Sequence, residues 1–440
     1  MVSKAGKHTR KHLYNKEEVK CSILQSQLVK FSFYNLLLVA LLGLLLRSFP
    51  FLQNISLSYK NLLHGHSHFA FGGWVMPVML ALLLKYFPES TSKVAYKHWR
   101  NIAYLLLSSA YGMLLSFPFQ GYGAVSIIFS TLSVGAGFYL TIIIWKVLKG
   151  AKTTTSTSFL RWGVFYLALS AMGPFATGPL ISLGYQGTPI YYNAVYFYLH
   201  FQYNGWFTFA VLALLYRMME NNGVATNNKR IFLLFNIACI PSYILSILWN
   251  QPGFVFNIVG GLSAFIQLVG FFYLLQDLKL YSKRHKIGGL FKLAFFAFFL
   301  KLVLQLISSF PDTALLAYHQ RNFVIAYLHL VLLGFISLFV IATIIESYKI
   351  RWVGQIKVGV SLFLFSLFTT ESLLVLQALA GMYGITFQNY SLLLLLFSCC
   401  FPLGIVFIMQ AVYKAIFHQK PFWVHTKEPL HSDNNLIVQS

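Results

Sequence analysis

Three histidines recur at nearly equal spacing in this chain, each within the same short motif. His68, His200 and His329 are each followed by glycine at the fifth position and by Trp or Phe at the sixth, and each is preceded two residues earlier by His or Tyr. The histidines are separated by 132 and 129 residues. Neutral imidazole binds haem iron, copper or zinc. The pattern therefore predicts three similar units whose histidines carry metal or haem chemistry.

The composition places these histidines in a membrane. Of the 440 residues, 58% are hydrophobic and 10% are charged, and the mean hydropathy is +0.67. Such a chain has too little polar surface for soluble domains. The formal net charge of +23 does not indicate a nucleic-acid partner, because the basic residues lie in short loops between apolar segments, where they set membrane orientation. The expected partner is a lipid bilayer.

Twelve apolar segments are long enough to cross a bilayer, which takes about 20 residues. A backbone exposed to lipid must satisfy its own hydrogen bonds, so each segment is predicted to be a helix. The segments cover residues 32–49, 63–86, 101–118, 122–146, 160–184, 191–216, 231–249, 253–276, 289–310, 322–345, 358–381 and 389–413. The expected fold is an all-α integral membrane protein, with a basic tail over 1–31, a membrane domain over 32–413 and a second tail over 414–440.

The basic residues give an independent test of this segment count, because Lys and Arg accumulate in cytoplasmic loops. The two tails and the connections after the even-numbered segments carry 29 of the 33 Lys and Arg residues. Both termini are therefore predicted to be cytoplasmic, in a multi-pass protein of the cytoplasmic (inner) membrane.

The three motifs fall on the second, sixth and tenth segments, the same place in each unit of four helices. The predicted architecture is a pseudo-threefold bundle of three four-helix units, with an approximate threefold axis along the membrane normal. All three motif helices start on the non-cytoplasmic side, so their histidines are expected in the outer part of the membrane. Residues two apart on a helix point about 200° apart. His66 and His68 are therefore expected to face different neighbours.

This topology resembles the catalytic subunit (subunit I) of the haem–copper oxygen and nitric oxide reductases, which include cytochrome c oxidase. In that family a low-spin haem is held by histidines of helices two and ten. The resemblance implies that the haem ligands here are His329 and His68, with His66 as the near alternative. A copper or iron ligand on helix six of the family corresponds to His200. The run from that histidine also resembles nitric oxide reductase, which has Glu-Gly where this chain has Asn204 followed by Gly.

The chain departs from the family on helices seven and ten. The adjacent histidine pair of helix seven is missing, since the run 240–243 is Ile-Pro-Ser-Tyr. Tyr327 replaces the helix-ten histidine that binds the catalytic haem in the family. The two histidines that bind the low-spin haem in the family have counterparts in this chain, whereas most ligands of the family's binuclear centre do not. It implies a haem-binding redox protein that transfers electrons, with an electron donor or respiratory subunits as partners and with no assigned catalytic residue.

Other functions stay open on the residues alone. The stretch 66–73 also resembles the haem- and copper-containing membrane proteins of the nitric oxide response. A copper or zinc ion held by His66, His68 and His200 would need no haem. A metal or solute transporter, or an assembly subunit without cofactors, is a further alternative. Transporters are commonly built from two similar halves, which fits three repeats less well.

Two formal charges lie deep inside apolar segments, Lys301 on the ninth and Glu371 on the eleventh. Both lie about 11 to 13 positions from the inner ends of their helices, and an unpaired charge inside a membrane is costly. The sequence therefore predicts an ion pair between them, with a proton path through Glu371 as the functional alternative.

Overall fold

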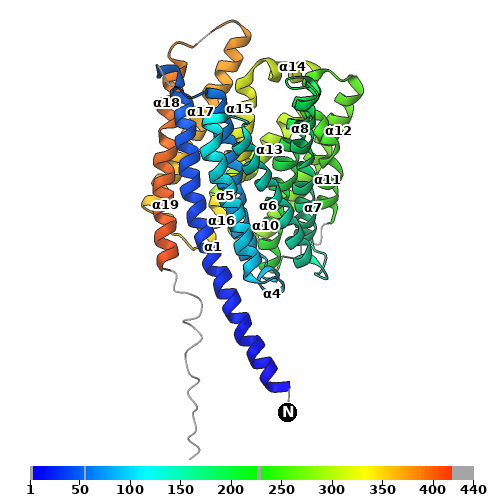
Figure 1. Ribbon diagram of the computed structural model, residues 1–440, viewed down its shortest axis with the longest axis vertical. Coiled ribbons are helices and arrows are strands. Elements are labelled where there is room, and N and C mark those ends of the chain that lie inside the picture. The colour runs from blue at the N-terminus through cyan, green and yellow to red at the C-terminus, as the bar shows by residue number, and fades with distance from the viewer. Residues whose placement is uncertain (1–2, 54–55, 225–228, 386, 419–440) are drawn as a thin grey trace, which may run out of the picture.

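The computed structural model describes residues 3–53, 56–224, 229–385 and 387–418, with side chains from residue 16 onward. All regular elements in these ranges are helical (Figure 1). Within the described residues, ten helices are long and apolar enough to cross a membrane. The predicted all-α membrane protein is confirmed at this level.

The helices follow one another up and down the bundle (Figure 1). The first half contains α1 (Ser3–Ser48), η1 (Phe49–Phe51), α2 (Tyr59–Phe69), η2 (Ala70–Val75), α3 (Met76–Tyr86), α4 (Glu89–Lys93), α5 (Tyr96–Gln120), α6 (Ala124–Leu148), α7 (Thr155–Ser170), α8 (Met172–Ser182), α9 (Pro189–His200), η3 (Phe201–Phe207) and α10 (Thr208–Asn221). The second half contains α11 (Lys229–Cys239), η4 (Pro241–Ser246), η5 (Leu248–Asn250), α12 (Phe254–Ser282), α13 (Gly289–Ile307), α14 (Pro311–His319), α15 (Arg321–His329), η6 (Leu330–Ser337), α16 (Leu338–Ser347), α17 (Gln355–Met382), α18 (Tyr390–Ser398) and α19 (Cys400–His418).

Two of the twelve predicted segments are not among the ten candidate spans. The segment 191–216 lies within α9, η3 and α10, which are helical throughout. The segment 231–249 is broken, because α11 ends at Cys239 and the chain continues as the 3-10 helices η4 and η5. Pro241 follows the break; proline has no N–H to donate and its ring clashes with the preceding turn. The described chain thus gives ten candidate spanning helices against the twelve predicted.

The three helices that carry the motifs lie at the centre of the bundle. We call them the motif helices: α2–η2–α3, α9–η3–α10 and α15–η6–α16. In the first and third, 83% and 67% of the most apolar window is buried, against 28% to 50% in the other eight candidate spans. In the second, every residue of η3 and nearly every residue of α10 is buried. The motifs therefore occupy the core of the protein.

Each motif helix touches the other two. The contacts are a hydrogen bond from Trp74 Nε1 to Ser337 Oγ at 2.8 Å, one from Trp206 Nε1 to Met76 Sδ at 3.0 Å, and the rings of Tyr203 and Tyr327, whose centroids are 6.4 Å apart. Two of these contacts use the aromatic residue that ends a motif. The aromatic residue at the end of the motif therefore connects one unit to the next.

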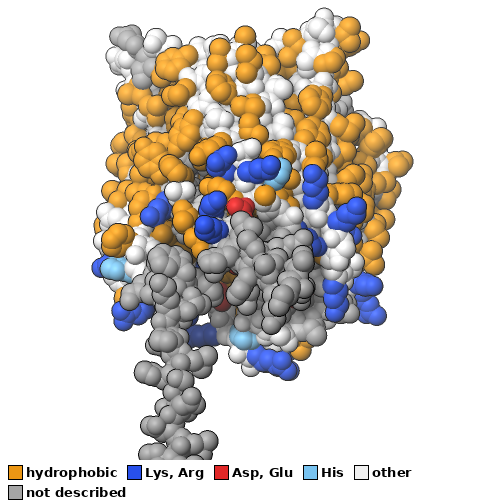
Figure 2. Space-filling view, turned by 60° about the horizontal axis from the view of Figure 1, so that its bottom comes forward, with side chains coloured by type: hydrophobic (Ala, Val, Ile, Leu, Met, Phe, Trp, Pro, Cys, Tyr) orange, Lys and Arg blue, Asp and Glu red, His pale blue; other side chains and the backbone are white. Residues whose placement is uncertain are grey.

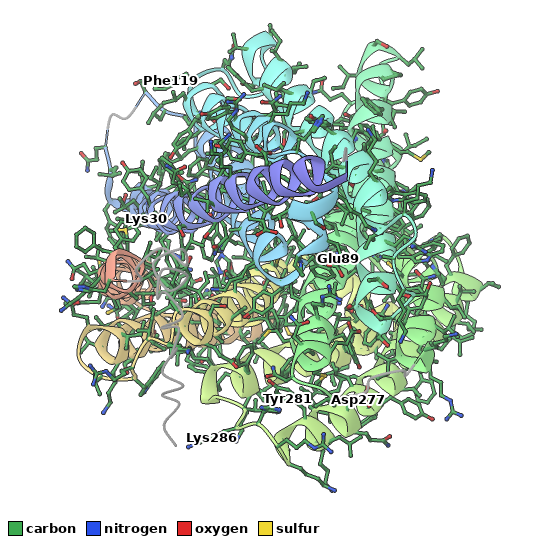
Figure 3. The ribbon with its side chains drawn as sticks, turned by 90° about the horizontal axis from the view of Figure 1, so that it is seen from below. Lys30, Glu89, Phe119, Asp277, Tyr281 and Lys286 are labelled. Atoms are coloured by element: carbon green, nitrogen blue, oxygen red, sulfur yellow. The ribbon has the colours of Figure 1, made fainter. Side chains whose placement is uncertain are left out.

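Lys and Arg side chains gather around one end of the bundle, which we call the basic end (Figure 2). The start of α1 and the short helix α4 lie there, and α14 lies at the opposite end (Figure 1). Arg217 joins helices at the basic end through ion pairs with Glu89 and Glu220. In the view from below, Tyr281 and Lys286 lie at the edge opposite Phe119 (Figure 3). The basic end is thus held by polar contacts, whereas the centre is apolar.

Candidate functional site

Each motif histidine is followed within two residues by a π-helical segment. These segments are η2, η3 and η6, and they cover Ala70–Val75, Phe201–Phe207 and Leu330–Ser337. A π-helix leaves the ordinary helical hydrogen-bond pattern, is rare, and is frequently found at functional sites. The three motifs therefore share a local backbone geometry as well as a sequence pattern.

The motif glycines allow close packing next to these segments. A Cβ added at Gly205 would lie 2.6 Å from Cβ of Tyr166 on α7, a distance that real Cβ atoms do not tolerate. At Gly334 the nearest atom would be Cβ of Ala297 at 3.3 Å, a much milder conflict. The same sequence position is therefore strictly glycine in one repeat and more permissive in another.

We expect Gly205→Ala to lower the melting temperature of the detergent-solubilised protein more than Gly334→Ala does. Forcing a methyl group into a well-packed core costs about 1–3 kcal/mol, and the backbone of α7 leaves no flexible side-chain end to move. Thermal unfolding followed by circular dichroism measures the difference. Equal melting temperatures for the two variants would show that the close approach of Tyr166 is not a packing constraint.

The ring of His68 faces α5 and the loop that follows it. It stacks on Phe117 with 4.5 Å between centroids and 6° between planes, and its Nε2 lies 3.2 Å from the hydroxyl of Tyr122. The contacts of His329 lie on α17 instead. The structure therefore does not bring His68 into a pair with His329.

His66 points to the other side of the same helix, toward α1. A Cβ added at Gly43 would lie 3.3 Å from Cε1 of His66. The side chain is close enough to His329 and Arg47 to interact with both electrostatically. Its Nδ1 atom is buried and forms no well-aligned hydrogen bond with the described residues, although the ring has a polar contact with the backbone of Val39 on α1. A buried nitrogen without a well-aligned hydrogen bond is costly, so Nδ1 is the His66 atom that is most open to a ligand.

Glu371 fixes the orientation of His329. The His329 Nδ1 lies 2.9 Å from Glu371 Oε1. An ionised carboxylate can only accept, so Nδ1 carries a proton and donates it; in the neutral form of His329 the lone pair is then on Nε2. A carboxylate hydrogen-bonded in this way commonly sets the tautomer of a metal-binding histidine. His329 is thus held in the form that can bind a metal through Nε2.

Arg47 completes this group of side chains. It donates a hydrogen bond to Ser398 Oγ and interacts electrostatically with Glu371. We call Arg47, His66, His329 and Glu371 the polar cluster; they come from α1, α2, α15 and α17. Arg47 was missed as a site residue from the sequence.

The predicted ion pair between Lys301 and Glu371 is not formed, so that prediction is wrong. Glu371 pairs with His329, and Lys301 forms no salt bridge with a carboxylate of the described residues. Lys301 is 1% exposed, lies 5.5 Å from the ring centroid of Phe298, and interacts electrostatically with His200. The two charges belong to different interfaces, because α17 packs mainly on α19 and α15 whereas α13 packs on η6 and α12.

His200 uses both of its ring nitrogens in buried hydrogen bonds. Its Nε2 lies 2.9 Å from the carbonyl oxygen of Cys239, and its Nδ1 lies 3.1 Å from Nδ2 of Asn204. The break of α11 before Pro241 frees this carbonyl, and the histidine satisfies it. No group of three or more His, Cys, Asp or Glu side chains converges as metal ligands in the described ranges. The metal role predicted for His200 therefore has no free nitrogen to support it.

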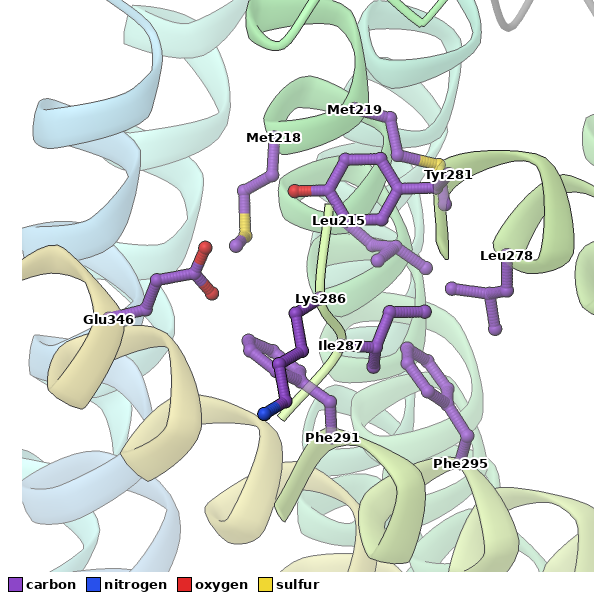
Figure 4. Close-up of a pocket in the computed structure, with 10 residues that line it drawn as sticks. All are labelled: Leu215, Met218, Met219, Leu278, Tyr281, Lys286, Ile287, Phe291, Phe295 and Glu346. Carbon is purple, nitrogen blue, oxygen red and sulfur yellow. The ribbon is translucent and has the colours of Figure 1, made fainter. Parts of the chain in front are cut away.

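A small, partly open cavity lies at the basic end, between Met218, Tyr281 and Glu346 (Figure 4). Its volume of about 20 Å³ leaves room for about one water molecule. It is too small to hold an organic ligand.

No protein-family model matches this chain, and no curated protein matches it. The assignment of residues therefore depends on the geometry of the chain itself.

Proposed function

We propose that this chain is a membrane haem protein that transfers electrons, in which His66 and His329 would hold the iron. The observation that carries the proposal is the polar cluster. Among the described residues, one of its histidines has a buried nitrogen without a well-aligned hydrogen bond, and the other is held by a carboxylate at Nδ1, which leaves Nε2 to bind. Two imidazoles saturate haem iron and favour electron transfer over activation of a bound ligand.

The donor set fits haem with one change from the sequence-based assignment. His66 replaces His68, because the ring of His68 faces α5, away from His329, whereas His66 is close enough to His329 to interact with it electrostatically. When bound, haem supplies one-electron transfer. Glu371 fixes the orientation of His329. Its negative charge next to this histidine would favour the oxidised state of the iron, which carries the larger positive charge.

We further propose twelve crossing segments in three four-helix units, with both termini on the cytoplasmic side of the membrane. The three π-helical segments and the mutual contacts of the motif helices support the threefold arrangement. The occupied nitrogens of His200 and the absence of histidine from 240–243 support a protein without a binuclear centre. An electron donor, and respiratory subunits, are the partners that such a function needs.

The visible spectrum of the purified chain, oxidised and reduced, tests the proposal. Expression in cells supplied with haem should give the sharp absorption bands of a low-spin haem after reduction, with one haem per chain. A purified, folded protein that is colourless would overturn it.

We expect Glu371→Gln and Glu371→Ala to differ in their effect on haem. Glutamine keeps an oxygen acceptor for His329 Nδ1 and removes the charge, so haem should stay bound with a higher midpoint potential. Alanine removes the acceptor as well, and haem affinity should fall about 10–100-fold, as for other residues that orient a metal ligand. Haem content and redox titration measure the two effects, with Glu346→Gln at the basic end as the control. Identical haem content and potential in all variants would contradict the role given to Glu371.

A further inference from the structure

Two histidines of α2 lie one helical turn apart and face the same tyrosine. The ring centroids of His64 and Tyr122 are 4.9 Å apart, and His68 Nε2 lies 3.2 Å from the Tyr122 hydroxyl. His64 and His68 interact electrostatically with each other as well. The three side chains therefore approach one another pairwise.

The surroundings hold this group in place and leave part of it unsatisfied. Phe117 stacks flat on His68 and lies 6.2 Å from His64 between centroids. The Nε2 atom of His64 is buried and has no hydrogen-bond partner among the described residues. Tyr122 is 49% exposed, in the loop between α5 and α6. A small ion can therefore reach the group from the surface at the end of the bundle opposite the basic end.

We infer that His64, His68 and Tyr122 form a transition-metal site that takes a divalent copper ion. Two histidines at positions i and i+4 on one helical face can bind one metal ion. Imidazole nitrogen suits copper, and Cu²⁺ binds a given nitrogen and oxygen donor set more tightly than the other divalent first-row metals. None of the three residues belongs to the polar cluster, so this site is independent of the proposed haem.

Binding through all three residues releases one proton. The metal-free phenol of Tyr122 is neutral and shares a hydrogen bond with His68 Nε2. When the oxygen coordinates Cu²⁺, the O–H bond breaks and the proton passes to water, while the two histidines bind through neutral nitrogens. No electron is transferred in this step.

The test is a Cu²⁺ titration of the purified full-length protein after metal removal by chelation, with copper bound per chain and electron paramagnetic resonance as readouts. The wild-type protein should bind one ion per chain, with hyperfine splitting from two nitrogens. His64→Gln and His68→Gln should each weaken binding by at least about tenfold. Tyr122→Phe should keep the nitrogen splitting and lose the visible charge-transfer band of a copper-bound phenolate.

His319→Gln is the matched control, because His319 is exposed and ends α14 at the same end of the bundle. This variant should bind copper as the wild type does. Melting temperatures show whether each variant is folded. Copper binding that survives both His64→Gln and His68→Gln, or no binding by folded wild-type protein, would overturn the site. Haem spectra recorded on the same samples report separately on the polar cluster.

Discussion

Replacing His66 or His329 by alanine is expected to abolish the low-spin haem absorption, whereas His68→Ala is expected to leave it intact. Each axial imidazole is needed to keep haem iron six-coordinate and low-spin. His66 and His329 lie near each other in the polar cluster, and His68 lies against α5. Haem content per chain and the reduced-minus-oxidised spectrum measure the effect.

His68→Ala is the matched control, because His68 shares a helix, a depth and partial burial with His66. Loss of the band in His68→Ala with retention in His66→Ala would contradict the pairing and restore the ligand assignment made from the sequence. Retention of the low-spin band in all three variants would show that the haem is bound by other residues.

His200→Ala is expected to destabilise the protein strongly while leaving haem in the folded fraction. The change leaves the buried Cys239 carbonyl with one partner fewer, the Asn204 side chain without its acceptor, and a cavity in the core. An unsatisfied buried polar group costs about 1–3 kcal/mol, and truncation of a large buried side chain adds a cavity cost. Thermal unfolding in detergent measures the change.

His319→Ala, at an exposed position, should unfold at the wild-type temperature. A His200→Ala protein that melts like the wild type but has lost a bound metal would instead support the metal role implied by the family resemblance. His200→Asn is a milder version, since its amide can still donate to a carbonyl.

The repeated motif identified from the sequence marks three places that share a local backbone geometry in the structure. Residues of the three repeats fall on π-helical segments in the structure. Hydropathy does not explain the central position of the motif helices, because the most apolar window of Tyr59–Tyr86 has a mean hydropathy of 1.6 and is 83% buried, whereas that of Ala124–Leu148 has 2.0 and is 28% buried. The π-helical geometry itself was not predicted, because it depends on how the helices pack rather than on a residue pattern. Glycine at each fifth position was the available signal, and Gly205 shows its packing reason.

The rotation of a helix about its axis was the information that the sequence lacked. The 200° separation of His66 and His68 predicted that they face different neighbours, and they do, but it could not say which of them faces His329. The same limit explains the wrong ion pair. Rise per residue gave Lys301 and Glu371 similar depths, whereas packing of α13 and α17 turned them to different interfaces.

The break in the segment 231–249 has a cause that can be seen in the sequence, but the prediction of twelve segments did not take it into account. Pro241 lies in its middle, and a proline there ends the regular helix. The break has a consequence for the site, since the freed carbonyl of Cys239 is the group that His200 binds. A residue interpreted from the sequence as a metal ligand therefore has a structural partner instead.

The measurement that tests the central claim most directly is the electron paramagnetic resonance spectrum of the oxidised, haem-loaded protein. Two imidazole ligands give a low-spin ferric signal that differs from the high-spin signal of a haem with one or none. The wild type and His68→Ala should show the low-spin signal, and His66→Ala and His329→Ala should lose it. A wild-type spectrum that is high-spin, or a low-spin signal that persists in His66→Ala, would contradict the assignment of haem to His66 and His329.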